Sequence, residues 1–199
     1  MFEPIPEMET DDEMRFYIVV DDKTTWPQVE YALVVDSDID ALNALLTRET
    51  NVMDVLLVCC DRAELASDVL DGLEQKFRIS LFFATKTIPE EVLHDSIAEL
   101  CWASYHSHNF DILDADCLLS GCSPIWSLNE TVITAGVKSN SSPRAAILML
   151  HHSRIPNEQR VKEYIAQVEN SLGEGCVSLV SYSDGRNADA CNYSLLAAW

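Results

Sequence analysis

The chain is predicted to fold as an α/β protein built from repeated strand–helix–strand units. Two observations favour this class. Short apolar runs rich in β-branched residues, such as 53–60 (MDVLLVCC), have the length and composition of buried parallel strands. Between such runs lie segments such as 63–77, in which apolar residues recur at helical spacing. Parallel strands joined by right-handed crossover helices are therefore expected.

The N-terminal half is predicted to alternate strands with helices along its whole length. Ser37 is expected to cap the first helix, which places Ile39, Leu42, Leu45 and Leu46 on one face. Pro89 stands where a first helical turn accepts proline, and Glu90 and Glu91 follow at the positive end of the helix dipole. We expect strands at 14–22, 28–36, 53–60 and 79–85, and helices at 38–49, 63–77 and 89–105.

The C-terminal half begins with an irregular polar stretch at 106–124. Further on, Asn157 is expected to cap a helix that keeps apolar spacing to Leu172, and Gly173 and Gly175 supply a left-handed ending. Strands are predicted at 130–137, 144–152, 175–183 and 191–199.

The 199 residues carry a net charge of −20, and the first 13 hold six acids and no base. Residues 1–14 are therefore predicted to form an acidic mobile tail. So few Lys and Arg side chains disfavour contact with nucleic-acid phosphates or anionic lipid. The charge fits either simple solubility or an acidic face for a basic partner, including a DNA-mimic role.

Neither a long apolar run nor a secretory leader is recognised, and the seven cysteines fall mainly in apolar runs, as buried free thiols do. A cytoplasmic, reducing location is the expectation.

The segment N-F-D-I-L-D places Asn109, Asp111 and Asp114 in the pattern N-x-D-x-x-D. This pattern resembles the catalytic (synergy) loop of the FtsZ/tubulin family, and the order of elements over 37–199 resembles that family as well, except that one C-terminal helix is expected to be missing. The resemblance implies a reduced tubulin/FtsZ-like arrangement: a GTPase-like α/β region at 15–88, a linking helix at 89–108 and a C-terminal α/β domain at 109–199.

The same resemblance exposes a departure at the nucleotide loop. The family has a glycine-rich G-G-G-T-G-[ST]-G loop after the strand that corresponds to 53–60, because phosphate oxygens must reach backbone N–H groups unhindered by Cβ atoms. This chain has no glycine there, and carboxylates stand in its place. The residues of this degenerate loop include Asp61, Arg62, Glu64 and Ser67. The expectation is a pseudo-GTPase that is not an enzyme and holds no cofactor.

A chain with the acidic loop but no nucleotide pocket would contact a polymer from one side only. Asn109, Asp111 and Asp114 are therefore interpreted as an interaction loop, and the expected partner is FtsZ, a tubulin-like polymer or another copy of the chain. The competing interpretation is a solvated, Asx-rich turn that follows a helix.

Two other constellations remain as alternatives. Asp21 and Asp22, Asp61, and Thr85 with Lys86 end three predicted strands, as the carboxylates of a receiver-like phosphoacceptor do, although only one helix fits between Asp22 and Asp61 where that fold needs two. Zinc-type ligands also gather in one region, without standard spacing. They are Cys101, His106, His108, Cys117 and Cys122. No nucleophile motif or dinucleotide fingerprint is found.

Overall fold

In the computed structural model, the described residues are 14–86, 88–107, 109–121, 124–135, 142–151, 157–173, 176–183 and 193–199. The predicted tail therefore lies outside the described residues apart from Met14, and so does the loop 184–190. Three residues named in the sequence analysis also fall outside them: His108, Cys122 and Gly175.

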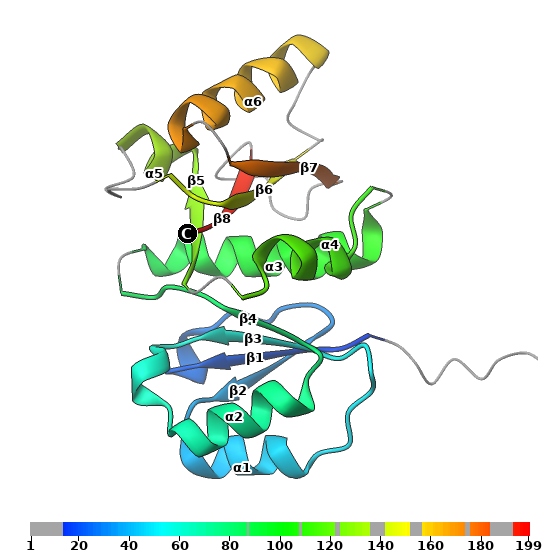
Figure 1. Ribbon diagram of the computed structural model, residues 1–199, viewed down its shortest axis with the longest axis vertical. Helices are drawn as coiled ribbons and strands as arrows, with labels where there is room; N and C mark the ends of the chain where they lie inside the picture. The colour runs from blue at the N-terminus through cyan, green and yellow to red at the C-terminus, as the bar shows by residue number, and fades with distance from the viewer. Residues whose placement is uncertain are drawn as a thin grey trace, which may run out of the picture.

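The N-terminal half forms a four-stranded parallel sheet in the order β2-β1-β3-β4 (Figure 1). Its strands are β1 (Phe16–Val20), β2 (Ala32–Asp36), β3 (Val55–Cys59) and β4 (Ile79–Phe82). Helices α1 (Ile39–Thr47) and α2 (Ser67–Lys76) cover the sheet face turned away from the second half. Every residue of β1 and β3 is buried, as expected for central parallel strands covered on both faces. Short 3₁₀ turns follow β1 and β3, at Lys23–Thr25 (η1) and Arg62–Glu64 (η2).

The C-terminal half forms a second sheet of mixed direction in the order β5-β8-β6-β7. Its strands are β5 (Ile125–Asn129), β6 (Ala145–His151), β7 (Val177–Ser183) and β8 (Tyr193–Ala198). β8 runs antiparallel to both β5 and β6, whereas β6 and β7 are parallel. Helix α6 (Glu158–Leu172), capped by Asn157 as predicted, lies on the outer face of this sheet (Figure 1).

The long helix α3 (Glu90–His106) lies between the two sheets (Figure 1). Its buried residues Leu93, Ile97 and Leu100 belong to one core that also includes Ile18 of the first sheet and Ile147 of the second. The sheets are joined at one point as well, where the backbone of Phe83, just after β4, bridges to Ile125 of β5. Helix α3, the shorter helix α4 (Ile112–Leu119), which contacts both sheets, and this bridge hold the two halves together.

The predicted cap of α1 is wrong by one residue. Asp38, not Ser37, accepts hydrogen bonds from the backbone N–H groups of Asp40 and Ala41, at 3.0 and 2.9 Å. Helix α1 therefore begins at Ile39, whose side chain is 52% exposed and does not share the buried stripe of Leu42 and Leu45. A first-turn residue extends beyond the sheet edge, so its helical spacing does not bring it into the core.

Two segments of the C-terminal half were assigned wrongly. The predicted strand at 130–137 is wrong over 130–135, which form helix α5 (Glu130–Ala135). Asn129 accepts hydrogen bonds from the N–H groups of Thr131 and Val132, both at 3.1 Å, and this cap outweighs the strand preference of the β-branched residues. The segment 106–124, expected to be irregular, contains helix α4 (Ile112–Leu119), and strand β5 follows it.

Cys59, Cys60 and Cys101 are buried free thiols, in agreement with their predicted role as small hydrophobes. Cys117 is exposed and Cys176 is half-buried. None of the helices among the described residues combines the length and apolar character needed to cross a bilayer.

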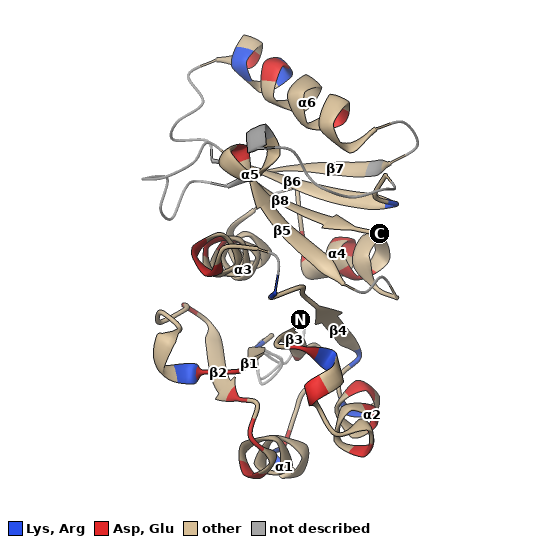
Figure 2. Cartoon of the chain, turned by 90° about the vertical axis from the view of Figure 1, so that its left-hand side faces the viewer, with Lys and Arg blue, Asp and Glu red and all other residues tan. Residues whose placement is uncertain are grey.

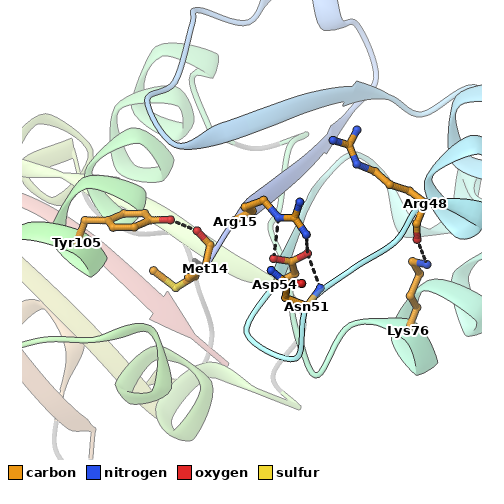
Figure 3. Close-up of polar contacts among 7 residues, drawn as sticks. All are labelled: Met14, Arg15, Arg48, Asn51, Asp54, Lys76 and Tyr105. Atoms are coloured by element: carbon orange, nitrogen blue, oxygen red, sulfur yellow. Dashed lines mark hydrogen bonds and ion pairs between the residues drawn. The ribbon is translucent and has the colours of Figure 1, made fainter. Parts of the chain in front are cut away.

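A charged pair fixes the start of β1 against the turn between α1 and β3 (Figure 3). The carboxylate of Asp54, with its side chain 0% exposed, accepts hydrogen bonds from Nε and Nη2 of Arg15 at 3.2 and 3.0 Å. It also accepts the backbone N–H of Asn51 at 2.9 Å. The hydroxyl of Tyr105 donates to the carbonyl of Met14, which ties the same strand to the end of α3.

The two partners of this pair differ in solvent contact, so their removal has unequal effects. Arg15→Met leaves the buried Asp54 carboxylate without its counter-charge, and we expect a loss of about 3 kcal/mol of unfolding free energy. Asp54→Asn leaves Arg15, 43% exposed, free to be hydrated, and should cost only about 1–2 kcal/mol. Urea denaturation followed by circular dichroism measures both, with Lys23→Met in the exposed turn η1 as the control. An Arg15→Met loss no larger than that of Asp54→Asn would contradict the assignment.

Candidate functional site

The candidate site lies where β1, β3 and β4 end, at the edge of the N-terminal sheet. Parallel strands deliver their following residues to one edge, and here they deliver Asp21, Asp61 and Lys86. Acidic residues are spread over α1, α2, α3 and α4, while α6 carries both signs (Figure 2).

Asp61 organises the turn that follows β3. Its Oδ1 accepts the N–H of Ala63 at 3.0 Å and so caps η2, and its Oδ2 receives Nζ of Lys86. The Lys86 Nζ also lies 3.3 Å from Oε1 of Glu64. Two carboxylates of one turn therefore share a single ammonium group supplied from beyond β4.

The backbone N–H groups of this turn are used internally. The N–H of Ala63 donates to the Asp61 side chain, that of Glu64 to the Asp61 carbonyl at 2.9 Å, and that of Leu65 to the Arg62 carbonyl at 3.3 Å. Ala66 then stands at the cap position of α2 without a side-chain cap, and Ser67 is the first helical residue. The backbone N–H groups of Ala63, Glu64 and Leu65 are therefore all used within the turn itself.

The ion pair sets the charge state of its members. The hydrogen bond from Lys86, followed by that from Ala63, lowers the pKa of Asp61 below its ordinary value. The same bonds, to Asp61 and then Glu64, raise the pKa of Lys86. The Arg62 guanidinium instead donates to Glu74 at 2.7 Å and lies 4.5 Å from the ring centroid of Phe82. Arg62 and Lys86 are therefore both paired with neighbouring carboxylates.

Asp21 and Asp22, which end β1, behave differently from each other. Partial desolvation, reinforced by the nearby Glu64 carboxylate, raises the pKa of Asp21, whose Oδ1 accepts the Ser37 hydroxyl at 3.4 Å. Hydrogen bonds from the hydroxyl and the N–H of Thr24 lower the pKa of Asp22, which caps η1. The Asp61 carboxylate also contributes to the raised pKa of Asp21, but among the described residues no group of three or more His, Cys, Asp or Glu side chains gathers here as metal ligands.

An open cleft of about 320 Å³ lies beside the turn, on the side facing the second sheet. Its walls combine the ion-paired turn with aromatic surface from the end of β4 and from β5. The Trp126 ring lies 5.2 Å from that of Trp199 between centroids, at a tilt of 54°. No spacing rule in the sequence links Trp126 to Asp61, so sequence reasoning missed this neighbour.

The predicted interaction loop lies after α3 and has well-defined contacts. The side-chain amide of Asn109 donates to the carbonyl of Val180 on β7 at 3.2 Å. Asp111 caps α4 by accepting the N–H groups of Leu113 and Asp114, and the Asp114 carboxylate accepts the N–H of Asp111 at 3.0 Å. This capping box closes the helix start, a structural role that the motif resemblance did not include.

The loop and the turn do not form one site. Lys86 lies just before α3 and Asn109 just after it, and a 17-residue helix is about 25 Å long. The residues singled out in the sequence therefore occupy two separate places, at opposite ends of the central helix.

Metal and nucleophile chemistry finds no support in the part of the chain that is described. Among those residues no three His, Cys, Asp or Glu side chains gather as metal ligands, and Cys101 faces the core while Cys117 is exposed. Burial raises the pKa of Cys60 to about 12 and that of Cys59 well above its ordinary value, so both remain thiols.

A parallel sheet and a mixed sheet on either side of a central helix form an FtsZ/tubulin-like fold. Among solved structures, an empty FtsZ dimer from M. jannaschii matches with a TM-score of 0.50 and 11% identity, covering 94% of this chain and 88% of that one. A point mutant of FtsZ from M. jannaschii also matches with a TM-score of 0.50 and 11% identity, covering 92% and 90%. No family model and no curated protein matches the chain. The predicted fold class is thereby confirmed.

Removing the ammonium group from the turn has a direct consequence for Asp61. Lys86→Met should raise the Asp61 pKa toward its ordinary value, because the first cause of its depression is lost. A carboxyl group whose pKa is lower in the folded than in the unfolded state adds stability at pH values above its unfolded-state pKa, and this stability is lost as the pH falls through its folded-state pKa. The variant lacks this contribution, so on acidification it should unfold at a higher pH than the wild-type chain. Carboxyl ¹³C NMR titration measures the shift, with Lys162→Met on α6 as the control; an unchanged Asp61 midpoint would rule the pair out.

Proposed function

We propose that this chain is a non-enzymatic interaction protein of the FtsZ/tubulin-like class that modulates a cell-division or cytoskeletal polymer by contact. In this proposal it is cytoplasmic, binds no GTP or other cofactor, and interacts with neither nucleic acid nor membrane. Its net charge of −20 supports the last two points, because few cations are available to displace counterions from phosphate.

The observation that carries the proposal is the turn after β3. A phosphate group bound at such a turn needs free backbone N–H groups and no nearby negative charge. Here the amides of Ala63, Glu64 and Leu65 are engaged locally, and the Asp61 and Glu64 carboxylates lie where a phosphate would have to approach. To bind a phosphate, the turn would have to open, and opening would break its hydrogen bonds and the ion pair with Lys86. This cost supports a loss of nucleotide binding.

The other end of α3 supplies the contact surface in this proposal. Asp111 is exposed and Asp114 half-buried, and the capping box fixes both carboxylates relative to β7 through the nearby Asn109 anchor. Such a fixed acidic loop fits insertion into a neighbouring subunit better than a loose turn does. Because the opposite end lacks a nucleotide site, the contact is one-sided and would cap a filament.

The two sheets and α3 also support the division of the chain proposed from its sequence. Region 15–88 contains the parallel sheet, 89–108 the linking helix, and 109–199 the mixed sheet with its helices.

The proposal predicts an effect on FtsZ assembly. Adding this protein to purified FtsZ of the same host with Mg-GTP should lower the light-scattering plateau in proportion to the amount added. The GTPase rate of FtsZ should change over the same range of added protein. Asp111→Asn together with Asp114→Asn should abolish the effect, since asparagine still caps helices but carries no charge. Asp116→Asn on α4, a charge change outside the capping box, is the matched control.

Unchanged kinetics at stoichiometric ratios would refute the polymer role. Saturable, Mg²⁺-dependent GTP binding by the chain alone, measured by equilibrium dialysis, would refute the nucleotide-free role independently.

A second candidate is an acidic regulatory module that binds a basic partner and accepts a phosphoryl group on Asp61. The contact between Asp61 and Lys86 across two strand ends favours it, whereas the single helix between β1 and β3 argues against a complete receiver fold. Labelling by acetyl phosphate that disappears in Asp61→Asn would promote this candidate over the first.

A further inference from the structure

Strand β2 is an edge of the parallel sheet. Its hydrogen-bonded neighbour is β1, on one side only, and no backbone bond to another element is formed on its outer side among the described residues. Edge strands in soluble proteins are usually blocked by lysine, proline or a bulge. The sequence of β2, Ala-Leu-Val-Val-Asp, contains neither lysine nor proline, and its register with β1 is continuous.

The face of β2 that is turned toward α1 is apolar and accessible. Ala32 and Val34 pack on the central core, so Leu33 and Val35 point to the opposite face. Leu42 and Leu45 of α1 pack in a core with Tyr17 and Val19 of β1, so the flank of β2 is not covered by any of the residues that the structure describes. An open groove of about 380 Å³ results between β2 and α1, and Leu33 is 39% exposed beside it.

The groove has opposite charges at its two ends. Arg48, which follows α1, lies 5.6 Å from the ring centroid of Tyr17, the residue paired with Leu33 near the start of β2. Asp36 and Asp38 lie at the far end, where β2 stops. The Arg48 carbonyl accepts Nζ of Lys76, while its guanidinium forms no ion pair within the described part of the chain (Figure 3).

We infer that β2 is a self-association surface at which two copies of this chain pair their β2 strands antiparallel about a two-fold axis. An axis through Val34 sets Leu33 of each copy opposite Val35 of the other, which buries the apolar pair in both grooves. Reversing the strand direction also brings Arg48 of one copy to the Asp36–Asp38 end of the other. The surface is therefore self-complementary in hydrogen bonds, apolar contact and charge.

A second copy fits this groove better than an unrelated strand does. The basic end of each groove meets the acidic end of the other, and this match occurs twice in one interface. Each copy carries −20, so long-range repulsion opposes the pairing, whereas the two Arg48–Asp36 contacts act at short range. The association is therefore reversible and needs salt above the physiological level, where the screening length falls below about 8 Å. This surface is separate from residues 109–114, so the polymer contact and the self-association can each fail without the other.

Sedimentation velocity over a range of concentrations, in buffer with salt above the physiological level, tests the inference. The wild-type chain should show a monomer–dimer equilibrium, and Leu33→Lys, which places a charge in the groove, should weaken it by about tenfold or more. Val52→Lys is the matched control, because Val52 is a 72% exposed apolar residue in the turn after α1, outside the groove.

A charge exchange separates a specific interface from a folding defect. Arg48→Glu should weaken the dimer to a similar extent, and adding Asp36→Lys to it should restore dimerisation by reversing both cross-copy pairs. Thermal unfolding of each monomer verifies that the fold persists. A wild-type chain that remains monomeric at every concentration, a dimer insensitive to Leu33→Lys, or a charge exchange that restores nothing would overturn the inference.

Discussion

The burial of helix α3 between two sheets is the constraint on which the rest of this molecule depends. A helix covered on both sides must carry apolar residues around most of its circumference, and Leu93, Ile97, Leu100, Cys101 and Ala103 meet that need. Within the part of the chain that the structure describes, the inner faces of both sheets pack mainly on α3 and on the short α4. The parallel sheet, the mixed sheet and the helix therefore share one continuous core.

The same helix determines where the chemically distinctive residues lie. Helix α3 separates the strand-end turn at Asp61 from the loop at Asn109, so these two places lie at opposite ends of the helix. At one end, carboxylates and their lysine close the turn in on itself. At the other, Asp111 and Asp114 close a helix start and leave acidic surface facing outward.

Several elements follow directly from short-range sequence signals. The apolar run 53–60 became the fully buried β3, and Asn157 and Gly173 mark the two ends of α6 as predicted, the latter with a φ of 86°. Errors arose where two local signals competed. At Glu130–Ala135 the β-branched residues favoured a strand, but the Asn129 cap and packing beneath α6 decided for a helix. Helix α4 was missed because its capping box was interpreted as part of a polar loop.

The sequence by itself determined the class of fold, the absence of glycine at the strand-end turn and the acidic loop, since each depends on residue types within a few positions. Only the tertiary structure decided which groups meet: that Lys86 pairs with Asp61, that Asn109 is anchored to β7, and that β2 lies at an edge of its sheet. Contacts of this kind join residues tens of positions apart. They are set by how sheets and helices pack in space, and no local propensity encodes that packing.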